Sequence, residues 1–382
     1  NDSTINPKEN KLKMNKSASI STVIATIFLA GCGGVGSSSK KQSSVEQSIE
    51  MRPADTSWGF QFQVEPNKKI INFDDLAYEK DCDGFVNWGS VAAIDINKDN
   101  LKDLIYAPRC GEKKFDEIYG VGHQSYLIVA LQKADGSFEF SNSKIFGRNS
   151  IPLGNIGGHM KADMMIPADI NNDGYIDLLQ TYRTSDTLSN TIKIFLSDSA
   201  LSFHEITSTT NISELSKLPF CASFVDIDNN NLLDLYIAND KSSGNSMYYN
   251  NGNLSFNNIS ESSNTGVDMD AMSVTIGDFN NDQYFDIYST NLEEGNKFFV
   301  NNKDLTFTEN AQNLSVSFNG QAWGSQFEDF DLDGYEDLYV SGALVGSDNP
   351  SSAFYSNIFG KYFEENDINY EPKPYHLRRR RR

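Results

Sequence analysis

The chain has 382 residues, of which 38% are hydrophobic and 22% charged, so it is long enough to bury the core of one large domain or two ordinary ones. Lysine and arginine total 32 against 52 aspartates and glutamates, which gives a formal net charge of -20. A surface this acidic repels phosphate backbones and excludes nucleic acid as a partner. The four cysteines form no C-x-x-C pair, which excludes a zinc ribbon and a thioredoxin-type redox site.

An apolar segment close to the N-terminus predicts a signal peptide, so residues 1–31 are interpreted as an upstream extension plus this signal. From Met14 a short basic start leads into an apolar run of about a dozen residues, too short to span a bilayer comfortably. The run ends in Leu-Ala-Gly-Cys at residues 29–32, which resembles the lipobox of bacterial lipoproteins. This resemblance implies lipidation of Cys32 and a location in the bacterial envelope, at the outer membrane or cell surface. An ordinary secretory signal is the alternative.

Composition divides the rest of the chain into three segments. Residues 32–50 are rich in glycine and serine and have nothing to bury, which predicts a flexible tether. The folded part is expected to span residues 51–370. Residues 371–382 form a tail that ends in five arginines. Two interpretations of this tail stay open, an artefact of sequencing or reading frame and a basic targeting tail.

A nine-residue pattern recurs five times, with aspartate at its first and last positions. The copies, here called the first to fifth acidic loops, cover residues 95–103, 169–177, 226–234, 278–286 and 329–337. Aspartate or asparagine also occupies positions 3 and 5 of every copy. Such side chains on alternate residues resemble the opening of an EF-hand calcium loop, where a glycine or asparagine at position 6 permits a sharp turn. These residue types are also ordinary turn formers, but five matching copies favour metal binding.

The repeated pattern therefore predicts up to five structural calcium ions. Positions 1, 3, 5 and 9 would supply side-chain oxygens, and position 7 would supply a backbone carbonyl. Without a cation, the carboxylates packed in each loop would repel one another strongly. The predicted ligands are Asp95, Asn97, Asp99, Leu101, Asp103, Asp169, Asn171, Asp173, Tyr175, Asp177, Asp226, Asp228, Asn230, Leu232, Asp234, Asp278, Asn280, Asp282, Tyr284, Asp286, Asp329, Asp331, Asp333, Tyr335 and Asp337.

Strand-like segments lie on both sides of each loop, for example residues 90–94 before the first loop and 104–107 after it. Each repeat then contains an aromatic strand, a turn and a phenylalanine, as in residues 247–256 and 297–307. Two hairpins in about 50 residues match the size of a propeller blade. The sequence therefore predicts an all-β fold, a β-propeller of four-stranded antiparallel blades, with five clear repeats and six or seven blades in the complete protein. Residues 58–64 alternate like an outer strand, which we expect to close the ring with the C-terminal blade.

These features resemble FG-GAP or VCBS repeats, which occur in integrin α-subunit propellers and in cartilage acidic protein-like proteins. The acidic loop, the strand at residues 104–108 and the later turn carry the resemblance, and residues 323–331 are especially similar to the second group. The resemblance covers residues 85–365 and implies a calcium-binding propeller. The integrin-type Phe-Gly and Gly-Ala-Pro pair survives only in part, at Ala107-Pro108, so no integrin-like partner is implied.

The remaining residues offer no catalytic centre, and we expect no enzyme. The four histidines share no spacing that would build a metal triad or a nucleophile-base pair. We expect a lipid-anchored, calcium-binding scaffold for binding or adhesion to a protein or a glycan. Two alternatives stay open: the accessory propeller of a secreted enzyme acting on polysaccharide or phosphoester, and an assembly scaffold of the envelope. The long insertions at residues 111–125 and 142–163 are the expected contact surface.

Three cysteines lie beyond the signal segment, at residues 82, 110 and 221. Cys82 and Cys110 flank the first acidic loop. They either form a disulfide, which an oxidising periplasm permits, or stay as two free thiols. Cys221 precedes the third acidic loop by five residues and is expected to be a small buried strand residue.

Overall fold

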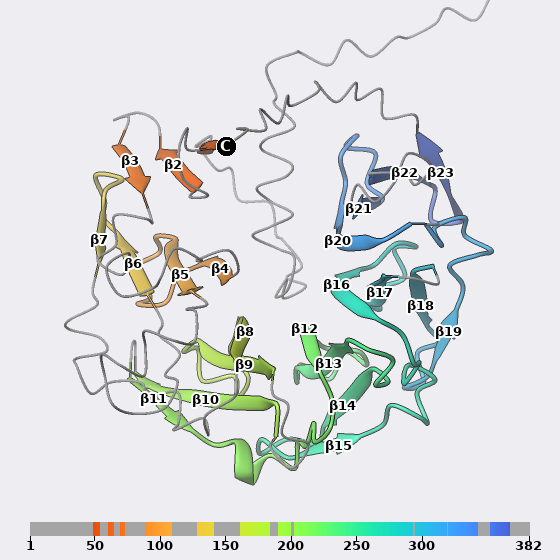
Figure 1. Cartoon of the computed structure of the whole chain (residues 1–382), viewed down its shortest axis with the longest axis horizontal. Coiled ribbons are helices and arrows are strands. Elements are labelled where there is room, and N and C mark those ends of the chain that lie inside the picture. Colours follow the sequence, from red (N-terminus) through yellow and green to blue (C-terminus); the bar gives the residue numbers. More distant parts are fainter. Residues whose placement is uncertain are drawn as a thin grey trace, which may run out of the picture.

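The computed structural model gives an all-β protein, as predicted. Five four-stranded antiparallel sheets and one three-stranded sheet follow one another around a ring in chain order (Figure 1). Among the described residues the one helical element is the 3-10 turn η2 (Thr207–Thr209), and no helix there has the length and apolar character needed to cross a membrane. The structure describes residues 49–53, 60–64, 69–72, 89–108, 128–140, 161–183, 190–199, 202–292, 295–318, 320–342 and 352–366.

Each sheet is built from strands that are consecutive in sequence. The three-stranded sheet contains β1 (Ile49–Pro53), β2 (Phe60–Val64) and β3 (Lys69–Asn72). The next two sheets contain β4 (Gly89–Ile94), β5 (Asp103–Pro108), β6 (Ile128–Gln132), β7 (Phe138–Phe140), and β8 (Lys161–Ala168), β9 (Asp177–Arg183), β10 (Ile192–Ser199), β11 (Ser202–Glu205). The last three contain β12 (Pro219–Val225), β13 (Asp234–Asn239), β14 (Ser246–Asn250), β15 (Phe256–Asn258), then β16 (Ala271–Gly277), β17 (Asp286–Asn291), β18 (Lys297–Asn301), β19 (Phe307–Glu309), and β20 (Ala322–Glu328), β21 (Asp337–Gly342), β22 (Ser352–Ile358), β23 (Tyr362–Asn366).

The first strand of each four-stranded sheet lies nearest the centre of the ring, and the fourth strand lies outermost (Figure 1). An acidic loop always joins the first strand to the second, and the second strand always begins at the aspartate of position 9. In the fourth repeat, for example, β16 ends at Gly277 and β17 begins at Asp286. Because the topology repeats, all five loops lie on the same rim. The predicted four-stranded blades, each with an acidic loop capping its first hairpin, are confirmed.

The expected closure of the ring by residues 58–64 is wrong. Residues 60–64 form β2, which pairs with β1 and β3 and not with the C-terminal sheet. The last sheet takes its outer strand from its own repeat, because β23 pairs with β22 across a short turn. Closing a short loop costs much less conformational entropy than pairing strands about 300 residues apart, so the local partner is favoured.

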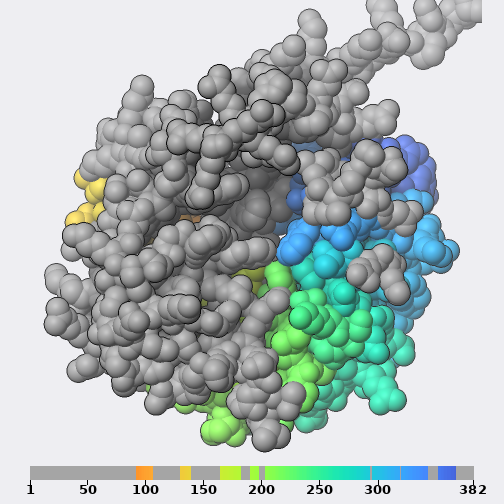
Figure 2. Space-filling model, viewed as in Figure 1, coloured from red at the N-terminus to blue at the C-terminus, as the bar shows by residue number. Residues whose placement is uncertain are grey.

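The hydrophobic core lies between neighbouring sheets. Between the last two sheets, the ring of Phe298 lies 5.1 to 6.1 Å from those of Phe279, Tyr288, Phe327 and Phe363, centroid to centroid, and all five are buried. Aromatic pairs of this kind contribute about 0.5–1.5 kcal/mol each beyond the area they bury. Further buried clusters join the preceding sheets in the same way. Figure 2 shows the last three sheets, green through blue, packed side by side, so each sheet relies on a neighbour to cover its apolar face.

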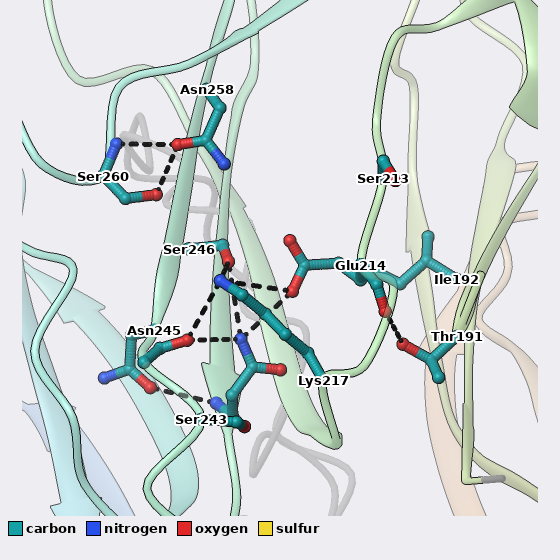
Figure 3. A network of polar contacts seen from close by, with 12 residues as sticks. Thr191, Ile192, Ser213, Glu214, Lys217, Ser243, Asn245, Ser246, Asn258 and Ser260 are labelled. Carbon is teal, nitrogen blue, oxygen red and sulfur yellow. Dashed lines mark hydrogen bonds and ion pairs between the residues drawn. The ribbon is translucent and has the colours of Figure 1, made fainter. Parts of the chain in front are cut away.

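A polar joint connects the β8–β11 sheet to the β12–β15 sheet (Figure 3). Glu214 is fully buried and accepts hydrogen bonds from Tyr248 Oη at 2.7 Å and from Asn239 Nδ2 at 3.1 Å. Lys217 Nζ lies 3.8 Å from the same carboxylate. The backbone carbonyl of Glu214 accepts a hydrogen bond from Thr191 Oγ1, directly before β10, at 2.8 Å. A buried carboxylate held by several donors is a strong tie between the two sheets.

Replacement of Glu214 by alanine is expected to destabilise the fold by about 1–3 kcal/mol, because it removes a buried acceptor shared by Tyr248 and Asn239. The carbonyls of Ser213 and Gly244 would remain as their acceptors. Glu214→Gln keeps the shape and one acceptor oxygen and should cost less. Glu261→Ala, at an exposed position, is the control. Urea unfolding measures the effect, and equal midpoints for Glu214→Ala and Glu261→Ala would contradict the role of this joint.

Candidate metal sites in the five acidic loops

One hydrogen-bond pattern organises all five acidic loops. The position 1 carboxylate accepts the backbone N–H groups of positions 5 and 6, and the position 3 side chain also accepts that of position 5. The position 5 side chain accepts the N–H of position 7. In the fifth loop these bonds measure 3.0 Å to both oxygens of Asp329, 3.1 Å to Asp331 and 2.9 Å to Asp333. The pattern gathers the oxygens of positions 1, 3 and 5 around one short stretch of backbone.

Positions 4 and 6 of every loop have a left-handed backbone, with φ between 57° and 95°. The sequence indicated this conformation at position 6, where the second and fifth loops carry Gly174 and Gly334. The sequence did not indicate a left-handed backbone at position 4, which holds lysine, asparagine or leucine. Asparagine tolerates this conformation better than most residues, and its presence at position 4 of three loops is the signal that could have identified the turn.

The aspartate at position 9 is buried in every loop, with at most 1% of its surface exposed. One oxygen accepts the N–H of position 2, and the other accepts an N–H from the third strand of the sheet. For Asp286 the donors are Phe279 at 3.3 Å and Asn301 at 2.8 Å. Each oxygen keeps a lone pair that can ligate a cation. The sequence predicted the ligand role alone and missed that this residue ties the loop to the third strand.

Burial raises the pKa of these position 9 carboxylates. Their backbone hydrogen bonds oppose the rise, and the neighbouring carboxylates of the same loop add to it. The pKa reaches about 6 for Asp177, about 7 for Asp234 and about 8 for Asp286, and it is also raised for Asp103 and Asp337. A divalent cation in the loop would favour the charged form of each group.

In two loops the carboxylates alone converge closely enough to hold a metal. Ligand oxygens lie within 4.8 Å of one another in two groups, Asp226, Asp228 and Asp234 of the third loop and Asp329, Asp331 and Asp333 of the fifth. The first, second and fourth loops also carry three aspartates each, at positions 1, 5 and 9, but these carboxylates do not converge within this distance. The predicted ligand at position 9 therefore joins such a group only in the third loop. Asparagine at position 3 of the first, second and fourth loops offers an amide oxygen, which is a calcium ligand as well. A donor set made only of oxygen atoms suits a hard cation such as Ca²⁺. The structure thus brings the predicted side chains of positions 1, 3 and 5 together in every loop.

Two charged residues outside the predicted set contact the fourth loop. Lys303 Nζ lies 3.2 Å from Asp282 Oδ2. Glu336, at position 8 of the fifth loop, accepts the N–H of Asp278 at 2.9 Å, and burial raises its pKa to about 7. Gly277, directly before Asp278, has to be a glycine, because a Cβ at this position would overlap the Glu336 carboxylate. Glu336 therefore joins the fifth loop to the fourth, a contact between blades that the sequence spacing did not reveal.

The cysteine predictions fall largely outside the described residues. The structure does not describe Cys32, the predicted lipidation residue, or the predicted disulfide pair Cys82 and Cys110. The expected contact surface also lies outside the described residues, except for residues 161–163 at the start of β8. Cys221 is fully buried on β12, as predicted. It is also disulfide-bonded, with its partner outside the described residues, so its interpretation as a merely small buried residue is corrected.

The second to fifth acidic loops match a known repeat family. The profile of the FG-GAP-like repeat matches residues 169–237, 226–289 and 278–340. The chain carries an FG-GAP repeat β-propeller. Each matched stretch begins at position 1 of an acidic loop and ends beyond the start of the next loop, so successive matches overlap at the loops. The resemblance to FG-GAP repeats is confirmed over these residues.

Two solved structures are distantly similar to the propeller. The V. cholerae biofilm matrix protein Bap1 is 16% identical over 73% of this chain, with a TM-score of 0.39, and the match covers 38% of the Bap1 chain. A candidate glycosidase from Bacteroides thetaiotaomicron is 9% identical over 66% of this chain and 82% of its own, with a TM-score of 0.34. No curated protein sequence matches the chain.

Proposed function

We propose that this FG-GAP repeat β-propeller is a calcium-stabilised binding scaffold of the bacterial envelope, anchored by a lipid on Cys32. The observation that carries the proposal is the fivefold recurrence of one acidic loop with one hydrogen-bond pattern. Side-chain oxygens of positions 1, 3, 5 and 9 and the carbonyl of position 7 would hold up to five Ca²⁺ ions. When bound, calcium would neutralise the clustered carboxylates and fix the hairpin that each loop caps.

A scaffold role toward a protein or a glycan is supported by where the acidic groups lie. Among the described residues, the groups of three acidic side chains that could hold a metal both belong to the repeated loops. The strand ends that border residues 111–125 and 142–163 lie on the rim opposite these loops. Loops that grow at a rim without disturbing the sheets are where recognition usually resides. We therefore propose recognition at that rim and no catalytic activity.

Ligand capture by the calcium-loaded full chain tests this function. A glycan array and a pull-down from detergent-solubilised envelopes are probed in parallel, with a variant lacking residues 111–122 as the control. Capture that the deletion abolishes, with calcium binding intact, supports the scaffold. Robust hydrolysis of a polysaccharide or phosphoester panel, lost on mutating a residue outside the five loops, would establish the enzyme alternative instead.

Lipid anchoring gives a separate prediction. Cys32→Ala is expected to release the protein from membranes or to block its processing, because only the cysteine thiol can accept the lipid. Fractionation of cells fed labelled palmitate measures both effects, with the unaltered protein as the reference. A Cys32→Ala protein that stays in the envelope and keeps its label would contradict the anchor.

A further inference from the structure

Consecutive acidic loops are linked by one repeated side-chain contact. The asparagine at position 4 of a loop donates its side-chain amide to the backbone carbonyl at position 6 of the next loop. The bonds run from Asn172 to residue 231 at 2.6 Å, from Asn229 to residue 283 at 2.9 Å and from Asn281 to Gly334 at 2.8 Å. They connect the second loop to the third, the third to the fourth and the fourth to the fifth.

The peptide that receives each amide also positions a predicted ligand. Its carbonyl, at position 6, accepts the bond from the previous loop, and its N–H, at position 7, donates to the side chain of position 5. For the peptide between Gly334 and Tyr335, the acceptor on the N–H side is Asp333 Oδ1 at 2.9 Å. The same bond measures 2.7 Å in the third loop and 2.9 Å in the fourth. Hydrogen bonds at the two ends of one peptide polarise and orient each other.

Backbone conformation alone does not account for the asparagines. Position 4 is left-handed in all five loops, with φ between 57° and 63°, although the first loop has Lys98 there and the fifth has Leu332. Lys98 still contacts the next loop, because its Nζ lies 3.4 Å from the centroid of the Tyr175 ring. Leu332 is 86% exposed. The amide therefore occurs in three loops that contact a following loop, whereas the first loop makes its contact through Lys98 and the last loop has Leu332.

We propose that the asparagine at position 4 is a positioning residue for the calcium site of the next loop. It holds the peptide that aims the position 5 oxygen, so the site it serves lies in the neighbouring blade and not in its own loop. A cation that orders one loop thereby favours binding in the following loop, and the coupling is reciprocal. This inference rests on the proposed calcium binding.

Calorimetric titration of the full chain with calcium tests the inference. Asn281→Gly removes the amide and keeps a residue that tolerates the left-handed backbone. Loss of one such hydrogen bond should weaken one calcium site by about fivefold. Leu332→Gly is the matched control, because it makes the same change at position 4 of the last loop, and it should leave every site unchanged. Asn229→Gly provides a second variant whose effect is expected in the fourth loop.

Double-mutant cycles identify the loop on which each asparagine acts. The effect of Asn281→Gly should vanish when Asp333→Ala has already disabled the fifth loop, and it should persist beside Asp282→Ala. The effect of Asn229→Gly should vanish beside Asp282→Ala. The inference would be overturned if the effect of Asn281→Gly vanished beside Asp282→Ala and persisted beside Asp333→Ala, or if its isotherm equalled that of Leu332→Gly. Neither outcome would contradict calcium binding. An unaltered chain that binds no calcium would instead overturn the proposed function.

Discussion

Removal of calcium is expected to lower the melting temperature of the propeller by roughly 4 °C for each site that is emptied. A ligand that binds only the folded state stabilises it by about 2.7 kcal/mol at a hundredfold excess over Kd, and 1 kcal/mol corresponds to about 1.5 °C in a domain of this size. Each loop also keeps a buried position 9 aspartate with a raised pKa, whose charge the cation would balance.

Differential scanning calorimetry in excess calcium and in excess EGTA measures this shift. Magnesium in place of calcium is the control for general ionic effects, because Mg²⁺ demands a tighter octahedral shell than these loops of mixed carboxylate and amide oxygens would offer. Identical melting curves in calcium and EGTA, together with no calcium in the purified protein by elemental analysis, would contradict the structural role of the ion.

The second large effect is expected at Asp286. Asp286→Ala would leave the buried N–H groups of Phe279 and Asn301 without their acceptors, at about 1–3 kcal/mol each. Asp286→Asn replaces one acceptor oxygen by a donor and should cost nearly as much. Both variants should also lose calcium at the fourth loop, whereas the exposed Asp268→Ala should change neither property.

Urea unfolding in EGTA and in calcium separates the two roles of Asp286. A loss of stability that is present in EGTA measures the hydrogen bonds alone, and an additional loss in calcium measures the ligand role. An unchanged midpoint in EGTA for Asp286→Ala would contradict the tie between loop and third strand.

The repeat period and the residue types at alternate positions were sufficient to predict the blades and the grouping of side chains in each loop. The grouping of side chains in a loop depends on residues within nine positions of one another, such as Asp329 and Asp333. Residues 60–64 alternate as an outer strand should, but alternation indicates which face is buried and not which strand is the partner. The pairing of β2 with β1 and β3 could therefore not be chosen from the pattern alone.

Contacts between blades were missed for a different reason. Asn281 and Gly334 are 53 residues apart, and Glu336 reaches Asp278 across 58. Such pairs follow from the angle and spacing at which two sheets pack, which a single sequence does not encode as a local pattern. The disulfide of Cys221 belongs to the same class, because its geometry depends on how distant segments meet.

The order of strands within the ring also determines how the protein would respond to tension. Each four-stranded sheet is a meander of consecutive residues, so a pull along the chain would peel an outer strand such as β23 away first and unzip its sheet inward before loading the next. The last three acidic loops start 52 and 51 residues apart. At about 3.5 Å for each extended residue, one unravelled blade would lengthen the chain by roughly 18 nm. Because neighbouring sheets share their buried clusters, the loss of one blade would expose the apolar face of the next.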